Sequence, residues 1–374
     1  MVKLTPPLGW NSWNTFAQNI NETVVRETAD AMVETGLKDA GYEYVVIDDC
    51  WQAKERDAEG NLTYDKEKFP NGMKALADYV HSKGLKFGMY SCAGHLTCAS
   101  MPGSFDHEFQ DAATFASWDV DFLKYDFCYF PVHIHELGCD YYRRMGTALA
   151  NSGREILFST CNWGIIDVKD WAKSCSASMW RSTLDIVDSW ESIKSIALQQ
   201  PALQPYNGQK CFNDMDMLVV GMNGKGNVGL TGCSYEEYRT HFCYWAMMGS
   251  PLMIGCDIRD MTEETKSILL NREIIAINQD MASCQPYMLN RQEDESVWVK
   301  QLANGDFAIG FFNFLDHDTG RYVSLFDMGL GGVTRKGLEL TDLFTGERIT
   351  VREMHSMKVA AHDCHMYRAR VIDI

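Results

Sequence analysis

A lysine and an aspartate lie two residues apart in an otherwise apolar stretch, and we expect chemistry at this pair. Residues 122–128 read Phe-Leu-Lys-Tyr-Asp-Phe-Cys, which is typical of a short strand buried on both faces. Side chains alternate along a strand, so Lys124 and Asp126 point to the same side. A buried ion pair between neighbouring elements would explain such a pair if it stood alone. Other strands of this chain, however, end in the same manner.

Polar and aromatic side chains follow most of the strand-like segments. In a barrel of parallel strands, active sites lie at the carboxyl ends of the strands. At those ends the sequence places Trp13, Asp48, Asp49, Tyr90, Lys124, Asp126, Asn162, Arg181, Asp185, Asp214 and Asp216. So many carboxylates around one mouth suit two chemistries. They bind a divalent metal, or they hold a polyhydroxylated ligand and act on it as acid and nucleophile.

Metal binding is the weaker interpretation. Barrel metallohydrolases use neutral imidazoles as ligands, and the His-x-His at 133–135 follows the fourth predicted strand in a loop. Magnesium held by Asp48, Asp49 and Asp216 is an alternative of similar weight. The glycine-rich segment 221–229 lacks the spacing of a phosphate-binding loop, which predicts a flexible loop there. We therefore expect no metal and no cofactor.

A sugar ligand accounts for more of these residues at once. Trp13 offers an apolar face to a pyranose ring, and the adjacent carboxylates of Asp48 and Asp49 can accept hydrogen bonds from two neighbouring hydroxyls. A carboxylate such as Asp126, kept ionised by Lys124 beside it, can attack an anomeric carbon. A second carboxylate on another strand would protonate the leaving oxygen. The residues alone therefore favour a glycosidase.

The chain alternates strand-like and helix-like segments up to about residue 280. Predicted strands are 8–10, 44–49, 86–90, 122–128, 156–161, 179–183, 215–218 and 251–254. Helical periodicity lies between them, for example over 73–80, 109–118, 188–198 and 235–248. Eight such units over about 250 residues indicate an α/β fold, a (β/α)8 TIM barrel. We expect this catalytic barrel to occupy residues 1–283.

The pattern changes after residue 283. Short segments, several of which alternate apolar and polar residues, lie at 296–302, 306–314, 321–325, 338–344, 348–351 and 365–371. Turn signals separate them, notably Asn304-Gly305 and Thr345-Gly346. This pattern predicts a C-terminal all-β antiparallel sandwich domain over residues 284–374, packed on the flank of the barrel.

Composition and charge bound the partners and the compartment. A net charge of -17 argues against nucleic acid or an anionic membrane as a partner. No run of 18 apolar residues occurs, so we expect no membrane span. The N-terminus has no signal-like apolar region, and thirteen cysteines without C-x-x-C spacing are typical of reduced, mostly buried thiols. These features predict a cytoplasmic protein, and a homo-oligomer is compatible with them.

Several motifs can be read together in chain order. They are Pro7–Trp13, Ala40–Tyr44, Ile47–Trp51, Tyr79–Lys86, Lys124–Cys128, Trp180–Arg181 with Asp185–Ile186, Asn213–Asp214, Asp216–Leu218 and Ala276–Asp280. In this order the chain resembles the retaining α-galactosidases and α-N-acetylgalactosaminidases of glycoside hydrolase family 27. The motifs run through the whole barrel, so the resemblance implies both the fold and the mechanism. The β domain resembles the family's C-terminal sandwich in placement only.

The resemblance implies an exo-acting enzyme that releases terminal α-linked galactose from oligosaccharides or glycoconjugates. In that reading Asp126 is the nucleophile and Asp185 is the acid/base. The residues placed around the sugar are Trp13, Asp48, Asp49, Tyr90, Lys124, Asn162, Arg181 and Asp216. Cys98 and Cys128 align with a pair that family members often join as a disulfide near the site. In a reducing compartment the two would stay thiols.

A retaining mechanism sets expectations for the geometry. We expect Lys124 to hold Asp126 ionised, while Asp185 stays protonated near neutral pH in a drier setting. The two carboxyl groups should stand about 5–5.5 Å apart, because an inverting pair needs roughly 6.5–9.5 Å. Asp48, Asp126, Asp185 and Asp216 should surround a single pocket.

Some positions depart from the family's pattern and bear on specificity. Asn162, with Ile165 three residues on, stands where acetamide-accepting members carry small residues, which favours a plain 2-hydroxyl and hence galactose. Met215 replaces a usual proline and Leu184 a small residue just before Asp185, so the leaving group and linkage stay open. α-N-acetylgalactosaminidase and β-L-arabinopyranosidase are the alternatives within the family. Outside it stand a sugar-binding barrel without turnover and a metal-dependent lyase or isomerase.

Overall fold

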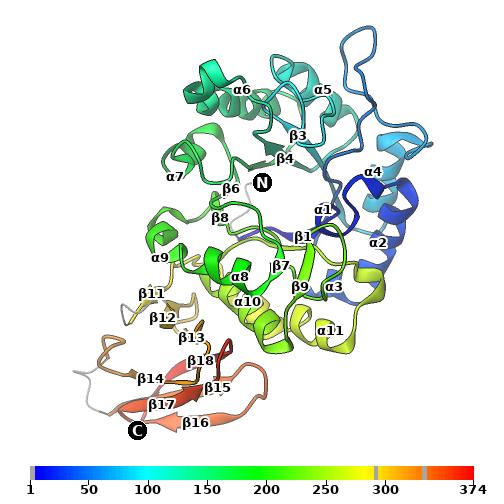
Figure 1. Ribbon diagram of the computed structural model, residues 1–374. Coiled ribbons are helices and arrows are strands. Elements are labelled where there is room, and N and C mark those ends of the chain that lie inside the picture. The colour runs from blue at the N-terminus through cyan, green and yellow to red at the C-terminus, as the bar shows by residue number, and fades with distance from the viewer. Residues whose placement is uncertain (1–4, 290–293, 331–334) are drawn as a thin grey trace.

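Parallel strands arranged in a ring form the centre of the structure, a computed structural model that describes residues 5–289, 294–330 and 335–374 (Figure 1). The strand order in this sheet is β10-β1-β2-β3-β4-β5-β6-β8. Their bounds are β1 (Leu8–Asn11), β2 (Tyr44–Val46), β3 (Lys86–Cys92), β4 (Phe122–Asp126), β5 (Leu157–Thr160), β6 (Met179–Arg181), β8 (Phe212–Asp214) and β10 (Leu252–Ile254). The predicted (β/α)8 barrel is confirmed.

The ring closes between the segment that follows β8 and the last strand. Leu218 bridges Ile254 in parallel, since its amide donates to the Met253 carbonyl at 2.7 Å and its carbonyl accepts from Gly255 at 2.9 Å. The seventh strand of the barrel is β8, which ends at Asp214, so the predicted position of that strand at 215–218 is wrong.

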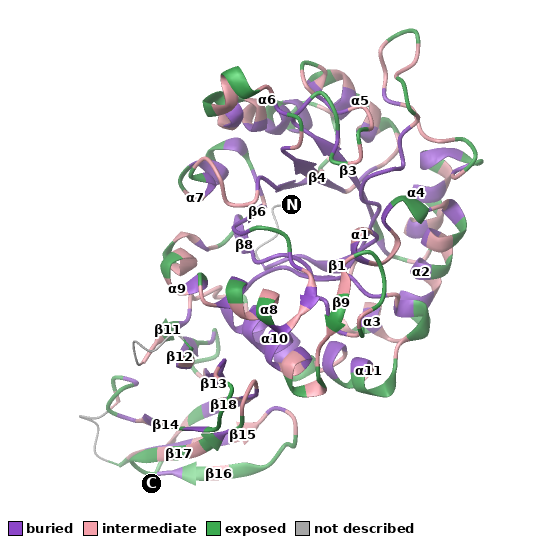
Figure 2. Cartoon of the chain, viewed as in Figure 1, coloured by how far each residue is buried: buried purple, intermediate pink, exposed green. Residues whose placement is uncertain are grey.

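Helices surround the ring and bury one face against it, as the purple inner and green outer sides in Figure 2 show. Their bounds are α1 (Trp13–Phe16), α2 (Glu22–Glu34), α3 (Leu37–Ala40), α4 (Gly72–Ser82), α5 (Glu108–Ser117), α6 (Gly138–Ala150), α7 (Val168–Trp171), α8 (Trp190–Ala197), α9 (Gln200–Leu203), α10 (Tyr235–Met248), α11 (Glu263–Leu269) and α12 (Arg272–Asn278). Single 3₁₀ turns are η1 (Ala17–Asn19), η2 (Val132–Leu137), η3 (Ala172–Cys175), η4 (Gln204–Tyr206) and η5 (Ile258–Asp260).

Alternation along the strands decides which side chains reach the inside of the barrel. On β4, Leu123 and Tyr125 belong to the large core shared with the helices, whereas Phe122 belongs to a small apolar cluster with residues of the other strands. Because side chains alternate, Lys124 and Asp126 share the side of Phe122. They follow it toward the carboxyl end of the strand, so the chemistry stands above an apolar floor.

A six-stranded antiparallel sheet and a two-stranded ribbon form the C-terminal unit. The sheet order is β11-β12-β13-β18-β15-β16, and β14 pairs with β17. The bounds are β11 (Tyr287–Met288), β12 (Glu295–Gln301), β13 (Phe307–Asn313), β14 (Thr319–Ser324), β15 (Lys336–Asp342), β16 (Arg348–Val351), β17 (Met354–Val359) and β18 (Cys364–Asp373). The sequence missed β11 and β17.

Both faces of the larger sheet are buried, which explains the dense apolar pattern of its strands. Val297 and Val299 on β12 pack in the sandwich core with Val323 of the ribbon. Trp298 between them packs in the barrel's core cluster, near Tyr244 of α10, with ring centroids 6.3 Å apart. The sandwich is thus confirmed, and it lies on the flank of the barrel as predicted (Figure 1). The exact boundary between residues 283 and 284 stays a prediction.

Candidate active site

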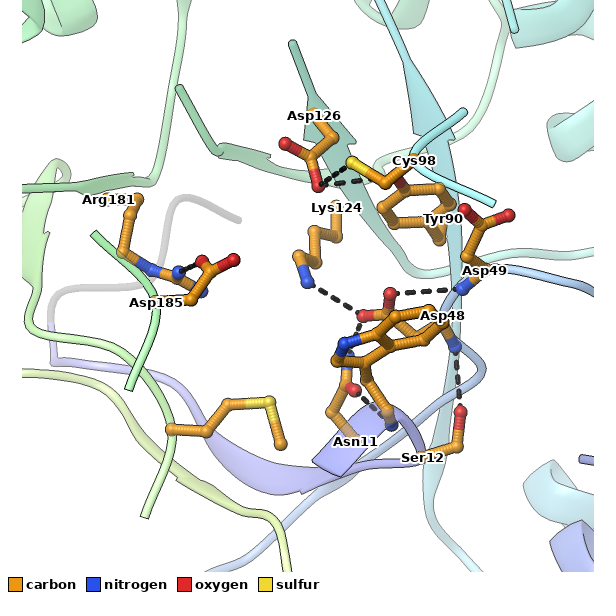
Figure 3. Close-up of polar contacts among 12 residues, drawn as sticks. Asn11, Ser12, Asp48, Asp49, Tyr90, Cys98, Lys124, Asp126, Arg181 and Asp185 are labelled. Atoms are coloured by element: carbon orange, nitrogen blue, oxygen red, sulfur yellow. Dashed lines mark hydrogen bonds and ion pairs between the residues drawn. The ribbon is translucent and has the colours of Figure 1, made fainter. Parts of the chain in front are cut away.

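Asp126 ends β4 inside the barrel mouth, with only 5% of its surface exposed. The Tyr90 hydroxyl donates to its Oδ2 at 3.2 Å, and the Phe127 amide donates to its Oδ1 at 2.9 Å. Tyr90 lies on the neighbouring strand β3. These bonds hold the carboxyl of Asp126 in one orientation beside Tyr90 and Cys98 (Figure 3).

The ammonium of Lys124 does not pair with Asp126, contrary to expectation. Its Nζ donates to Asp48 Oδ2 at 2.9 Å. Burial raises the pKa of Asp126 to about 7, and the charge of Lys124 opposes that rise only in part. Burial alone would lower the pKa of Lys124, but the carboxylate of Asp48 outweighs it and holds this pKa above its ordinary value. Lys124 therefore joins two strand ends instead of neutralising its own neighbour.

Asp48 follows β2 and is fixed by polar groups from β1 and β4. Asn11 donates its side-chain amide to Asp48 Oδ2 at 2.7 Å, and the Ser12 hydroxyl accepts from the Asp48 amide at 2.9 Å. Asn11 also accepts from the Trp13 amide at 2.9 Å. The sequence argument singled out neither Asn11 nor Ser12. Their position at the carboxyl end of a barrel strand, the rule that found the other residues, could have revealed them.

The neighbouring Asp49 is 1% exposed and anchors a loop from β3. Its Oδ2 accepts from the Ala99 amide at 2.9 Å, and its Oδ1 accepts from the Cys50 amide at 2.7 Å. Burial raises the pKa of Asp49, and the Ala99 amide opposes the rise. The anchored loop carries Cys98, which forms a disulfide with Cys128 across a Cα–Cα distance of 5.1 Å. The disulfide that the resemblance implied is thus present beside Asp126.

Arg181 gathers three carboxylates on the opposite side of the mouth. It ends β6, and 4% of its side chain is exposed. Its guanidinium lies 2.7 Å from Asp185 Oδ1, 2.7 Å from Asp216 Oδ1 and 3.6 Å from Asp214 Oδ2. A single planar cation thereby orients the side chains of two loops, those that follow β6 and β8.

Asp185 stands in a wet setting, where a dry one was expected. Its side chain is 66% exposed and its bonded partner in the structure is Arg181. The environments of the two carboxylates are therefore reversed with respect to the sequence prediction. Asp126 is the buried one, and Asp185 is the exposed one that faces the entrance.

Asp216 occupies a tight turn directly after β8. Its φ is 76°, and its carboxylate accepts from the Ile186 amide at 2.7 Å and the Met217 amide at 2.7 Å. The indole of Trp245 on α10 donates to its carbonyl at 2.9 Å. Burial raises the pKa of Asp216, and Arg181 opposes the rise. The bond to Ile186 ties this turn to the residue that follows Asp185.

The remaining predicted residues line the same end of the barrel but differ in role. Trp13 starts α1 and is partly exposed. Asn162 follows β5, is fully buried, and donates to the Ile165 carbonyl at 2.6 Å, so its amide shapes a turn. Leu184, beside Asp185, is 73% exposed and stands at the rim. Met215 is buried after β8 and lines no open surface.

The structure gives little to a metal. Within the described ranges, the one close group of candidate ligands is Cys98, Asp126 and Cys128, whose donor atoms lie within 4.8 Å of one another. The disulfide occupies two of these three donors. His133 and His135 lie in η2, and His135 packs edge-on against Phe127. The expectation that no metal takes part stays a prediction.

Figure 3 shows the labelled side chains converging from several strands on one space. Asp126 and Tyr90 enter from β4 and β3, Asn11 from the end of β1, Asp48 from the loop after β2, and Arg181 with Asp185 from across the mouth. The arrangement offers carboxylates and a lysine to a polyhydroxylated ring. It also offers one buried and one exposed carboxylate to a reacting bond.

Comparison with known proteins agrees with this geometry. Residues 5–280 match the family model described as "Alpha galactosidase A", and residues 292–369 match "Alpha galactosidase C-terminal beta sandwich domain". The chain is 47% identical over 368 residues to an α-galactosidase of Cyamopsis tetragonoloba, covering 97% of this chain and 85% of the relative.

Two crystal structures extend the match to three dimensions. α-Galactosidase I from Mortierella vinacea superposes with a TM-score of 0.89 at 33% identity, covering 98% of this chain and 97% of the other. The α-galactosidase of Saccharomyces cerevisiae solved with raffinose superposes with a TM-score of 0.86 at 28% identity, covering 99% of this chain and 98% of the other. Fold, site and sequence thus agree, and the chain belongs to the α-galactosidases of glycoside hydrolase family 27.

Proposed function

We propose that this α-galactosidase cleaves terminal α-galactosides with retention of configuration, using Asp126 as nucleophile and Asp185 as acid/base. One observation carries the proposal. A buried carboxylate oriented by Tyr90 faces a second, exposed carboxylate that Arg181 holds across the same mouth. A nucleophile must meet the sugar at a fixed angle, whereas the acid must meet a leaving group that arrives from solvent.

In the first step Asp126 attacks the anomeric carbon and the bond to the leaving oxygen breaks. Asp185 gives its proton to that oxygen, and a β-linked galactosyl ester forms on Asp126. In the second step Asp185 takes a proton from water, which attacks the same carbon and releases α-galactose. Asp126 must be ionised and Asp185 protonated at the start.

We propose that a proton passes between the two groups when substrate binds. In the free protein burial favours the protonated form of Asp126. Bound substrate would cover the exposed side of Asp185 and remove its water, which favours the protonated form there. Substrate binding would therefore move the proton from the nucleophile to the acid.

The ring of polar groups supports galactose as the sugar. Asp48 and Lys124 form a charged pair suited to adjacent hydroxyls, Asp49 lies beside this pair, and Asp216 lies on the Arg181 side of the mouth. A relative of known structure was solved with raffinose, which has a terminal α-galactose, so we propose small galactosyl oligosaccharides as substrates. A panel of nitrophenyl α-galactoside, α-N-acetylgalactosaminide, β-L-arabinopyranoside and α-glucoside separates this proposal from its alternatives in the family.

Nuclear magnetic resonance of the first-formed sugar tests the mechanism. Retention predicts α-galactose first, followed by slow mutarotation, and β-galactose first would show that Asp126 is not the nucleophile. Asp126→Gly should abolish turnover, and added azide should restore cleavage to give β-galactosyl azide. Asp185→Ala should spare substrates with very good leaving groups, because these need no proton.

We also propose a cytoplasmic location. Eleven cysteines of the described chain are free and eight of them are buried, which suits a reducing compartment. The oxidation state of the Cys98–Cys128 pair would then depend on the redox potential of the compartment. Cell fractionation combined with thiol alkylation tests both points, because a secreted protein would show this pair fully oxidised.

A further inference from the structure

The exposed acid/base Asp185 needs an anchor, and the loop around it has two. The first is the bond from the Ile186 amide to Asp216. The second lies two residues on, where Asp188 and Ser189 form the short strand β7 beside β9 (Gly229–Gly232). Figure 1 shows this pair of short strands next to α8 at the barrel mouth. Asp188 is 0% exposed although it follows a loop open to solvent.

The carboxylate of Asp188 is a hub for the glycine-rich segment. Its Oδ2 accepts from the Gly224 amide at 2.7 Å, and its Oδ1 accepts from the Tyr238 hydroxyl at 2.8 Å. That hydroxyl in turn accepts from the Asn223 amide at 2.8 Å. Both Asn223 and Gly224 have positive φ, at 53° and 74°. An otherwise exposed turn is therefore held by one buried charge.

The same segment rests on the helix that carries Trp13. The Val228 amide donates to the Asn14 carbonyl at 3.1 Å, and the Asp188 amide donates to the Val228 carbonyl at 3.0 Å. Gly226 lies so close to Asn14 and Thr15 that an added Cβ would stand 2.9 Å from their backbone. The segment that the sequence predicted to be flexible is a brace between two walls of the mouth.

We propose that Asp188 is a positioning residue that holds Asp185 at the distance and angle from which it protonates the leaving group. The inference rests on the proposed role of Asp185. Asp188 touches no reacting atom. It acts by locking the loop of Asp185 to the glycine-rich segment and, through that segment, to α1. A shift of about 1 Å in such a group can cost about 10²-fold in rate.

Leaving-group dependence separates positioning from plain stability. Asp188→Asn keeps the shape but removes the charge and one acceptor. Its NH2 group then faces either the Gly224 amide, which loses its acceptor, or the Tyr238 hydroxyl, which loses its acceptor and shares its oxygen with the Asn223 amide. We expect kcat for raffinose to fall by about 10- to 100-fold, because proton donation contributes about 10²–10⁴ for poor leaving groups. For dinitrophenyl α-galactoside, which needs no proton, we expect kcat within about 3-fold of wild type. Tyr238→Phe should act in the same direction but more weakly, since Gly224 keeps its acceptor.

Asp121→Asn is the matched control. Asp121 is a largely buried carboxylate at the opposite end of the barrel, where it binds Arg154 at 2.6 Å and the Phe87 amide at 2.8 Å. Asp121→Asn should lower Tm and leave the ratio of kcat for raffinose to kcat for dinitrophenyl α-galactoside unchanged. If Asp188→Asn lowers kcat equally for both substrates, the inference is wrong.

Asp185→Ala is measured alongside, so that failure of the positioning role of Asp188 can be told apart from failure of the proposed function. If Asp185→Ala loses raffinose hydrolysis selectively while Asp188→Asn behaves like the control, only the positioning role is wrong. If Asp185→Ala itself shows no selectivity for the leaving group, the acid/base assignment is wrong.

Discussion

Replacing the carboxyl of Asp126 with an amide measures how much the ionised carboxyl lowers the free energy of unfolding. Asp126→Asn keeps the volume and the acceptor for the Phe127 amide but removes the charge. Burial raises the pKa of Asp126 to about 7, against about 3.9 for an unfolded chain. Because the folded-state pKa is the higher one, the folded protein binds the proton more tightly. Wild-type stability therefore falls as the pH rises from about 4 to about 7.

The size of the effect follows from these two pKa values. Ionisation of Asp126 lowers the free energy of unfolding by roughly 1–2 kcal/mol at about pH 5 and by roughly 4 kcal/mol at about pH 8. The amide does not ionise, so the free energy of unfolding of the variant should gain roughly 2–3 kcal/mol on that of wild type between the two pH values. With an unfolding entropy of about 2.1 cal/mol/K per residue, this corresponds to about 3 °C in Tm for a chain of 374 residues.

Differential scanning calorimetry of the wild type and the variant at the two pH values is the assay. Asp185→Asn, whose carboxyl is 66% exposed, is measured alongside as the exposed counterpart. A Tm gap between Asp126→Asn and wild type that does not widen at the higher pH would refute the reasoning. It would mean that Lys124 and the hydrogen bonds compensate the burial of Asp126 completely.

Three further outcomes follow from the site. The α-galactoside should be cleaved about 10⁴-fold faster than the α-N-acetylgalactosaminide, and Asn162→Ser with Ile165→Ala should shift preference toward the acetamide; equal rates on the two substrates would contradict this. Replacing Cys98 and Cys128 with serine opens a crosslink with a sequence separation of 30, which should lower the free energy of unfolding by about 3.6 kcal/mol and Tm by about 5 °C. Exhaustive chelation should leave kcat/KM unchanged, and a loss restored by magnesium would revive the metal alternative.

The barrel and the ring of side chains were predictable because both depend on local pattern. Buried strands that end in charged residues are visible in the sequence, and the parallel fold brings those ends together. The seventh strand was misplaced because Phe212–Asp214 looks too polar to be buried. The side-chain amide of Asn213 donates to Gln200 Oε1 at 2.8 Å and its backbone amide donates to Asn207 Oδ1 at 2.9 Å, and such partners have no signature in a window of a few residues.

The electrostatics of the site were predicted less well. Lys124 and Asp126 share a side of β4, but residues two apart along a strand are about 6.6 Å apart, so a shared direction is not a contact. Lys124 instead reaches Asp48 on the next strand but one. Exposure of Asp185 depends on how the loops after β6 and β8 pack. Neither the ion-pair partner of Lys124 nor the exposure of Asp185 can be read from spacing along the chain.

The pairing of β1 has a consequence for the order of folding. This first strand lies between β2 and β10, and the indole of Trp10 donates to the carbonyl of Cys256 at 2.9 Å. During synthesis one edge of β1 stays without its partner until more than 240 further residues have left the ribosome. Contacts between residues so distant in the chain form slowly, and an open strand edge invites pairing with another chain. Nascent chains that stop short of residue 252 should therefore be the species most prone to aggregate.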